Sequence, residues 1–418
     1  EALVRAFEEG GWSPVPFHEA ADLYLINTCA VTAEAQRQSS QAVRSAIRRS
    51  PQALIAAAGC AAQLFPDYFS RIPGLDYLFG TGNKPGIPST VDSFGKPPSP
   101  QIRIEPLSSF PPLSLECPNP FLRTRAVFRI QDGCDAHCSY CIVPRARGHS
   151  RSLPPDQVRE GLLRLNAQGV REIILTGIHL GQYGLDLRPS WSLTGLLEEV
   201  LKIPTLPFLR LSSLEMHEVT PNLVSLIRHE ARVCPHLHIP LQSGDDPTLN
   251  RMNRPYSTAE YAELLHRIHA EIPDAALGAD VIVGFPGEDE SAFQRTHDFI
   301  ARLPLAYLHV FPYSSRPGTP AALFGGQVSA GEKKERARRL RALDQEKRSD
   351  FYRRCVGREF SALVLRSTGP AGWCEGLTGN YLPVRFRGQF QQNTRLRVRI
   401  IGRDDKGILA EVLPESKR

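Results

Sequence analysis

The sequence predicts an α/β protein in three parts: an N-terminal parallel α/β sheet, a central partial (βα)6 barrel and a C-terminal small β-barrel. Two observations lead to this prediction. Strand-like and helix-like segments alternate up to about residue 330, which is typical of parallel sheets covered by helices. After a strongly charged helix at 331–356, short strand-like segments follow one another with turns between them, as in small β-barrels.

The N-terminal part spans residues 1–91, with strands expected at 22–27 and 53–59. Cys29 and Cys60 each follow one of these strands closely. Because the carboxyl ends of parallel strands lie along one edge of a sheet, we expect the two cysteines to converge there. The alternative is that both are buried structural cysteines.

The central part spans residues 121–330 and follows a proline-rich segment, 92–120, that is expected to be a linker because proline disfavours long helices. It repeats a strand-then-helix unit six times. The expected strands are AVFRIQ, REIILT, FLRLSS, HLHIPL, ADVIVG and LAYLHVF. Six such units predict a partial (βα) barrel, whose functional residues gather at the carboxyl ends of the strands.

Cys134, Cys138 and Cys141 form a CxxxCxxC triplet in the loop after the first of these strands. Three thiolates can hold three irons of a cubane iron–sulfur cluster and leave the fourth open, whereas an electron-transfer cluster uses four cysteines. The neighbouring cysteines in sequence, Cys117 and Cys234, are distant. The triplet therefore predicts a catalytic cluster with an open iron.

The C-terminal part spans residues 357–418 and holds 11 Lys and Arg against 6 Asp and Glu, most of the chain's net charge of +6. Arg395, Arg397 and Arg399 alternate with apolar residues, so one face of this strand should carry a row of guanidiniums. The row favours nucleic-acid binding. The alternative is a solvent-exposed strand that resists edge aggregation. The basic helix at 331–356 is either a further phosphate contact or a solvated helix with internal ion pairs.

Composition restricts the setting. No run of eighteen apolar residues predicts a membrane span, and no signal peptide is visible. The nine cysteines are an odd number and do not form the dense framework of a small secreted protein. We therefore expect a cytoplasmic protein with no membrane partner.

Taken together, the motifs resemble those of the methylthiotransferases of the radical S-adenosylmethionine (SAM) superfamily, and the resemblance covers nearly the whole chain. It is carried by NTCAVT, AAGC, DGCDAHCSYCIVPRARGHSRS, LTGIHLGQYG, LRLSSLE, HLHIPLQSGDDPTLNRMNRPYS, GADVIVGFPGE and FPYSSRPGTPAA. The terminal barrel is placed like the TRAM domain of that family, an RNA-binding module. Tyr140, just before the third cysteine of the triplet, also fits the superfamily pattern.

The resemblance implies two 4Fe-4S clusters and SAM as cofactors. The triplet cluster would bind SAM and generate a 5′-deoxyadenosyl radical that abstracts hydrogen from C2 of an adenine. A second cluster, held by Cys29, Cys60 and a third cysteine, would present a sulfur that another SAM methylates. The family has that third cysteine just before the helix that opens this chain at Glu1, so we expect the sequence to be truncated at its start.

Three branches of the family differ in substrate. NTCAVT, TAEAQRQS and IQDGCD are most similar to the tRNA threonylcarbamoyladenosine methylthiotransferase branch (MtaB-like), which implies methylthiolation of N6-threonylcarbamoyladenosine beside the anticodon of tRNA. The alternatives are isopentenyladenosine in tRNA and an aspartate of a ribosomal protein. The ribosomal branch usually has QHA where this chain has Gln242, Ser243 and Gly244. An electron donor and a sulfur source would be further partners.

Residues at the ends of the barrel strands are expected to position SAM: Thr176, Gly177, Ser212, Ser213, Glu215, Gln242 and Ser243. Each could equally be a turn residue at a strand end. GFPGE at 284–288 is expected mainly to form a turn and secondarily to contact a nucleoside. His236 and His238 are expected to be structural. An alternative of another class is a non-catalytic RNA-binding protein whose cysteines hold zinc, with His137 or His149 as a fourth ligand.

Overall fold

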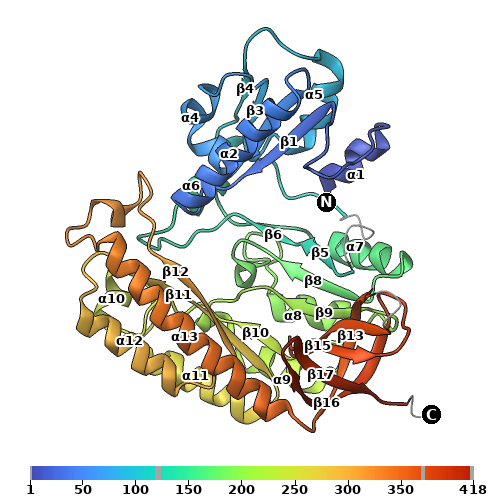
Figure 1. The fold of residues 1–418 in the computed structure, drawn as a ribbon, viewed down its shortest axis with the longest axis vertical. Helices are drawn as coiled ribbons and strands as arrows, with labels where there is room; N and C mark the ends of the chain where they lie inside the picture. Colours follow the sequence, from blue (N-terminus) through green and yellow to red (C-terminus); the bar gives the residue numbers. More distant parts are fainter. Residues whose placement is uncertain (1, 118–123, 369–371, 415–418) are drawn as a thin grey trace. The chain divides into compact units, whose positions relative to one another are not determined.

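The structure is a computed structural model that describes residues 2–117, 124–368 and 372–414 (Figure 1). The chain divides into two compact units, each assembled from separate segments. Unit 1 consists of Glu1–Ser114, Asp132–Ser152 and Ser314–Leu323. Unit 2 consists of Leu115–Gln131, Leu153–Tyr313 and Phe324–Arg418. The loop with the cysteine triplet therefore belongs to the same unit as Cys29 and Cys60.

Unit 1 is built on a parallel sheet with the strand order β1-β2-β3-β4. Its strands are β1 (Leu23–Thr28), β2 (Leu54–Gly59), β3 (Tyr77–Phe79) and β4 (Gln101–Arg103). Its helices are α1 (Ala2–Glu9), α2 (Ala33–Arg49), α3 (Cys60–Leu64), α4 (Pro66–Ser70), α5 (Ile87–Phe94) and α6 (Val143–Arg147). The alternating residues of β2 join two different apolar clusters, one on each face of the sheet, as expected for a strand covered on both faces. Strand β4 lies in the segment that was expected to be only a linker.

Unit 2 contains the six barrel strands that the sequence predicts. They are β5 (Ala126–Arg129), β8 (Glu172–Thr176), β9 (Phe208–Leu211), β10 (His236–His238), β11 (Ala276–Val283) and β12 (Tyr307–Pro312). The strands pair in parallel within two groups, β5-β8-β9 and β10-β11-β12, and a parallel bridge between Leu209 and Val233 joins the groups. Two short strands, β6 (Gln131–Asp132) and β7 (Arg151–Ser152), pair on either side of the cysteine loop.

Helices alternate with the barrel strands, as the periodic pattern predicts. They are α7 (Pro155–Ala167), α8 (Leu193–Val200), α9 (Pro221–His229), α10 (Asp246–Arg251), α11 (Thr258–Glu271) and α12 (Glu290–Arg302). Helix α11 begins with a capping box, in which Ser257 and Glu260 satisfy each other's backbone N–H groups. The basic helix α13 (Ala330–Cys355) runs along β12 and buries Ala337, Leu340 and Leu343 on one side.

The C-terminal part is a closed five-stranded barrel with the order β13-β14-β15-β17-β16. Its strands are β13 (Glu359–Thr368), β14 (Trp373–Thr378), β15 (Pro383–Arg387), β16 (Arg395–Asp404) and β17 (Gly407–Val412). A small β-barrel was predicted, but not strand β14. Closure removes exposed strand edges. None of the described helices combines the length and hydrophobicity that crossing a bilayer requires.

Candidate functional site

Cys29 and Cys60 lie next to each other along one edge of the sheet in unit 1. Strands β1 and β2 pair in parallel register with Thr28 opposite Gly59, and each cysteine is the next residue of its strand. Neighbouring strands are about 4.8 Å apart, so the two cysteines leave the sheet from adjacent positions, as the strand pattern predicts. Both are half-buried, and no disulfide involves either of them.

Local backbone geometry holds Cys60 at this edge. Gly59 has φ +113°, and a Cβ there would lie 2.7 Å from Asn27 Oδ1 and 2.8 Å from the Thr28 oxygen. Only glycine tolerates such a conformation without strain. The Thr28 hydroxyl donates to the Ala58 carbonyl at 3.0 Å and accepts from the Ala62 N–H at 3.0 Å. These bonds tie the first turn of α3 to the strand ends, and Cys60 is the first residue of α3.

Arg147, the last residue of α6, faces Cys60. Its Nε donates to the Cys60 Sγ at 3.1 Å, and its Nη1 lies 3.4 Å from Asp132 Oδ2. Burial alone would lower the pKa of Arg147, but the negative charges of Asp132 and Cys60 outweigh burial and raise that pKa. Arg147 is therefore a cation held between a carboxylate and a thiol.

Arg316 is a buried arginine that interacts electrostatically with Cys29. Its side chain is only 3% exposed, its Nη2 donates to Gln36 Oε1 at 2.5 Å, and its guanidinium stacks over the Phe65 ring at 4.8 Å. Its Nε has no hydrogen-bond partner among the described residues. Burial lowers the pKa of Arg316, while attraction to the Cys29 thiolate acts in the opposite direction. Each cysteine at the sheet edge thus interacts with an arginine, Cys60 with the half-buried Arg147 and Cys29 with the buried Arg316.

The triplet loop is shaped by backbone hydrogen bonds of its own. The Cys134 N–H donates to the Gly148 carbonyl at 3.1 Å, and the Cys141 N–H donates to the Cys138 carbonyl at 3.1 Å. Gly133 has φ +81°, and a Cβ there would lie 1.9 Å from the His149 oxygen, so the DGC motif requires glycine. The three cysteines are half-buried. Tyr140 is half-buried in the same loop.

The cysteine triplet is not among the groups of described residues whose three ligand atoms lie within 4.8 Å of one another. Thiolates bound to one Zn²⁺ lie about 2.3 Å from the metal and therefore about 3.8 Å from one another. Among the described residues, only His238, Asp280 and His309 bring three such ligand atoms within 4.8 Å of one another.

Four of the residues expected to position SAM lie directly at or after the ends of β8 and β9. Gly177, after β8, allows the close approach of Gln131, since a Cβ at 177 would lie 2.5 Å from the Gln131 Oε1. Ser212, after β9, is half-buried, and its hydroxyl has no partner in the part of the chain that the structure describes. Thr176 is half-buried and Ser213 is exposed.

The other residues expected to position SAM are already engaged within unit 2. The Glu215 carboxylate pairs with Arg254. Ser243 is fully buried, and its hydroxyl lies 3.2 Å from Thr296 Oγ1 of α12. Gln242 is buried with φ +66°, a strained conformation for a residue other than glycine, and a bridge pairs it with β11.

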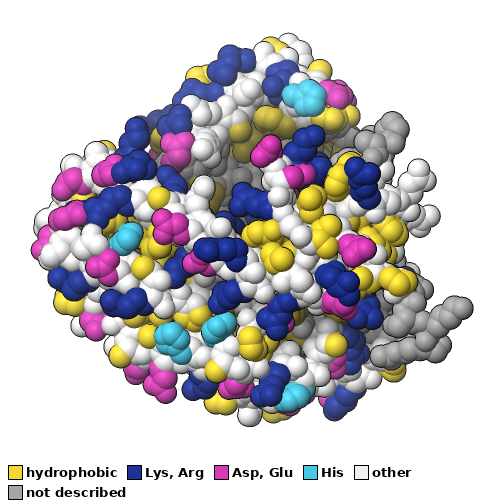
Figure 2. Space-filling view, turned by 60° about the horizontal axis from the view of Figure 1, so that its bottom comes forward, with side chains coloured by type: hydrophobic (Ala, Val, Ile, Leu, Met, Phe, Trp, Pro, Cys, Tyr) yellow, Lys and Arg dark blue, Asp and Glu magenta, His cyan; other side chains and the backbone are white. Residues whose placement is uncertain are grey.

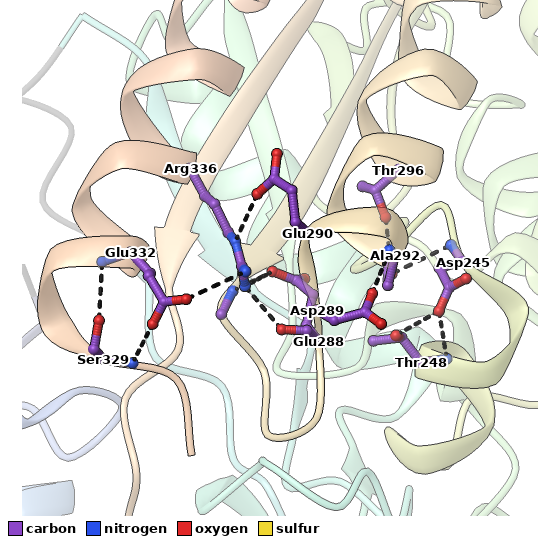
Figure 3. Close-up of polar contacts among 12 residues, drawn as sticks. Asp245, Thr248, Glu288, Asp289, Glu290, Ala292, Thr296, Ser329, Glu332 and Arg336 are labelled. Carbon is purple, nitrogen blue, oxygen red and sulfur yellow. Dashed lines mark hydrogen bonds and ion pairs between the residues drawn. The ribbon is translucent and has the colours of Figure 1, made fainter. Parts of the chain in front are cut away.

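The GFPGE motif connects the loop after β11 to helix α13 through hydrogen bonds and an ion pair (Figure 3). Glu288 is 3% exposed, and its Oε1 accepts from the Gly284 N–H at 2.8 Å and from Arg336 Nη1 at 3.0 Å. Burial raises the pKa of Glu288, although these two bonds act in the opposite direction. Figure 3 also shows Glu290 and Glu332 beside the guanidinium of Arg336. These contacts favour the structural interpretation of the motif.

Unit 2 also contains a polar group that the sequence analysis missed. His238 Nε2 lies 2.9 Å and His309 Nδ1 lies 3.2 Å from Asp280 Oδ1, and the Tyr307 hydroxyl joins His236 and His238 at 2.8 and 3.0 Å. Burial would raise the pKa of Asp280, but its bonds with the two histidines outweigh burial and lower that pKa to about 2. The only sequence signal was the presence of polar residues on the mainly apolar strands β10, β11 and β12.

The structure corrects the expected row of three exposed guanidiniums on β16. Arg395 is 12% exposed, lies 3.3 Å from Glu172 Oε2 and stacks on Phe208. It therefore packs against the central barrel. Arg397 and Arg399 are 55% and 44% exposed and pair with Glu359. Figure 2 shows Lys and Arg side chains interspersed with Asp and Glu over the visible face, so no continuous basic patch stands out there.

Comparisons with known proteins agree with these features. The Radical SAM superfamily matches residues 128–300, and the Uncharacterized protein family UPF0004 matches residues 1–80. The threonylcarbamoyladenosine tRNA methylthiotransferase MtaB of Aquifex aeolicus is 35% identical over 96% of both chains. The MtaB of Bacillus subtilis is 36% identical over 93% of this chain and 87% of the relative.

A second type of relative and a solved structure extend the comparison. The tRNA-2-methylthio-N(6)-dimethylallyladenosine synthase of Moorella thermoacetica is 34% identical over 87% of this chain and 83% of the relative. The radical SAM methyltransferase TsrM from Kitasatospora setae aligns with a TM-score of 0.53 at 16% identity. That alignment covers 77% of this chain and 68% of TsrM, and it shows a shared fold alone.

Proposed function

Because this chain belongs to the family of radical SAM tRNA methylthiotransferases, we propose that it adds a methylthio group to C2 of N6-threonylcarbamoyladenosine beside the anticodon of tRNA. The observation that carries the proposal is the 35% identity to a threonylcarbamoyladenosine tRNA methylthiotransferase over 96% of both chains. The enzyme is a transferase that uses a 4Fe-4S cluster and SAM.

Cys134, Cys138 and Cys141 are the residues that would hold this cluster. When bound, the cluster supplies the electron that cleaves SAM to a 5′-deoxyadenosyl radical. The chain's own contribution is a preformed loop, because Gly133 permits the turn and the Cys134 N–H is fixed on the Gly148 carbonyl. We further propose that the Ser212 hydroxyl and the backbone around Gly177 contact SAM, since both follow barrel strands and the Ser212 hydroxyl has no partner among the described residues.

We also propose a second cluster at Cys29 and Cys60, for which the family resemblance implies a third cysteine ligand. The support is their adjacency at the sheet edge and the hydrogen bond from Arg147 to the Cys60 Sγ. A donor set of half-buried thiolates beside cations suits an anionic iron–sulfur cluster. Iron and sulfide analysis of the complete protein tests this proposal. An iron content that corresponds to a single cluster and does not change in the Cys60→Ala variant would contradict it.

For tRNA contact we propose Arg397 and Arg399 on β16. Both are exposed on a barrel placed like an RNA-binding module, and exposed guanidiniums attract phosphates. Glu359 partly neutralises both side chains, so a phosphate would have to compete with that carboxylate. Arg395 does not belong to this surface because it packs against Glu172 and Phe208.

Mass spectrometry of tRNA nucleosides tests the substrate. A strain that lacks the gene should lose 2-methylthio-N6-threonylcarbamoyladenosine, and the complete protein, but not its Cys138→Ala variant, should restore it. Loss of the methylthio group from the dimethylallyl-type nucleoside instead would support the second candidate, which the 34% identity to the Moorella synthase favours. Unchanged methylthio nucleosides would rule out both tRNA activities.

A further inference from the structure

We propose that Arg147 and Arg316 form a binding site for an anionic sulfur species, a hydrosulfide or a small thiolate, beside Cys29 and Cys60. The inference rests on the second cluster of the proposed function and assigns to two arginines the task of holding the sulfur that is to be transferred. All four residues belong to unit 1.

The position of Arg147 is the first support. Its Nε is directed at the Cys60 Sγ at 3.1 Å, while Asp132 holds Nη1 from the other side at 3.4 to 3.5 Å. The carboxylate therefore fixes the direction of the guanidinium. A guanidinium presents several N–H groups in a rigid plane, so it can contact a cysteine sulfur and a neighbouring anion together.

The unsatisfied group on Arg316 is the second support. A buried polar N–H without an acceptor costs free energy and needs an explanation. Arg316 Nε is such a group in the described structure, on a side chain that is 3% exposed. Gln36 and Phe65 account for the remaining contacts of the guanidinium. An anion beside Cys29 would supply the acceptor that Nε lacks.

The charge balance at this edge is the third support. Arg147, Arg151 and Arg316 bring positive charge, and Asp132 supplies the nearby carboxylate, which it shares between Arg147 and Arg151. Lys84 adds a further cation, with its Nζ 2.9 Å from Asn27 Oδ1. A cation excess around thiolates favours an anionic ligand. A sulfur anion is the ligand that the transfer of a methylthio group requires.

The placement also connects the two cysteine sets through the chain. Arg147 lies six residues after Cys141 and ends the short helix α6. Ile142, just before that helix, joins the apolar cluster that contains Ala61 and Ala62 of α3. The loop that would hold the SAM cluster therefore also delivers the cation for Cys60. We expect its folding to prepare both sites at once.

The experiment isolates the N-terminal cysteine set in the complete protein. The parent carries Cys134→Ala, Cys138→Ala and Cys141→Ala, so that iron taken up anaerobically reports on the second cluster. Sodium hydrosulfide is titrated while electron paramagnetic resonance follows the reduced cluster and its reduction potential. The test variants are Arg147→Gln, Arg147→Lys, Arg316→Gln and Arg316→Lys. The matched control is Arg37→Gln, an exposed arginine of unit 1 that pairs with Glu34.

We expect each Gln variant to need at least about tenfold more hydrosulfide for half-saturation, because a charge-assisted hydrogen bond to the anion is lost. The reduction potential should become more negative because a nearby positive charge is lost. Each Lys variant should fall between its Gln variant and the parent, and Arg37→Gln should match the parent. Hydrosulfide affinity and potential equal to the parent in both Gln variants would overturn the proposal.

The iron content of the variants and of the parent is also decisive. If a Gln variant loses its iron but the matching Lys variant keeps it, charge at that position is required, which supports the proposal. If both lose it while circular dichroism shows a folded protein, the arginine is structural and the proposal fails. A parent that takes up no iron and sulfide would overturn the second cluster itself, whereas normal uptake with insensitive arginines would overturn the arginine site alone.

Discussion

The Nε of Arg147 donates a hydrogen bond to the Sγ of Cys60 across 3.1 Å, although the two residues are 87 positions apart in the sequence. Arg147 belongs to the loop of the cysteine triplet, and Cys60 begins the helix after β2. One contact therefore joins two cysteine motifs that a reading along the sequence treats as separate. The two sets of cysteines accordingly belong to one folded unit.

Replacement of Cys138 by alanine should abolish SAM cleavage and leave the fold intact. The triplet would lose one of three cluster ligands, and two thiolates do not hold a cubane cluster in the open-iron arrangement. 5′-Deoxyadenosine formation measured by chromatography should fall to background. Cys117→Ala, outside both sets, is the control and should retain it. Wild-type deoxyadenosine formation by Cys138→Ala would contradict the role of the triplet.

Replacement of Gly59 by alanine should destabilise unit 1. The new Cβ would have to occupy φ +113° within 2.8 Å of two oxygen atoms, and such strain costs about 1–3 kcal/mol. We expect a lower free energy of unfolding in urea and reduced iron binding by the N-terminal cysteine set. Gly86→Ala is the control, because its Cβ would meet nothing within 4 Å and its φ is −84°. Equal stability of the two variants would refute this account of Gly59.

The bonds of Asp280 should make stability depend on pH in the acid range. Its pKa falls from 3.8 to about 2 on folding. The stabilisation is therefore fully present above about pH 4 and is lost as pH falls through about 2. A shift of this size corresponds to about 2 kcal/mol. The difference in unfolding free energy between wild type and Asp280→Asn should be larger at pH 7 than at pH 3, and a difference that is constant with pH would exclude the effect.

Arg210 should be among the most sensitive positions of unit 2. It is 2% exposed, its Nε donates to Glu172 Oε1 at 2.9 Å, and its other nitrogens donate to the carbonyls of Thr378 and Gly379 in the C-terminal barrel. Its removal leaves the Glu172 carboxylate buried with weaker partners, which typically costs about 3–5 kcal/mol. Arg210→Leu should lower the urea midpoint and accelerate proteolysis of the C-terminal barrel. The exposed Arg228→Leu is the control and should behave as wild type.

Arg397→Gln combined with Arg399→Gln should weaken tRNA binding uniformly across tRNA sequences. Each lost phosphate contact should reduce the slope of log affinity against log salt by about 1. Filter binding at several salt concentrations measures this slope. Arg366→Gln is the matched control, because Arg366 is 70% exposed and pairs with Glu375 in the same barrel. A double variant with the wild-type slope would exclude β16 as the tRNA contact.

The sequence predicted those features that depend on local pattern. The six barrel strands and the adjacency of Cys29 and Cys60 follow from the alternation of strands and helices and from the rule that parallel strands end at one edge. Contacts between distant segments left no such pattern. Arg395 looked like an exposed guanidinium because its partner, Glu172, lies 223 residues away.

The group of His238, Asp280 and His309 was missed for a related reason. Each residue alone looks like an ordinary polar position on a strand, and only the register of β10, β11 and β12 brings them together. Strand β4 was missed because proline content indicates extended chain without indicating whether that chain pairs with a sheet.

The order in which the ribosome delivers the chain has a consequence for assembly. Unit 1 takes its last segment from residues 314–323, and Arg316 is in that segment. During translation, most of the polypeptide must therefore be synthesised before the last segment of unit 1 can pack beside the cysteines at the sheet edge. Iron loading of a nascent chain that does not yet include this segment would meet an unfinished site, so maturation of this enzyme should follow synthesis of residues 314–323.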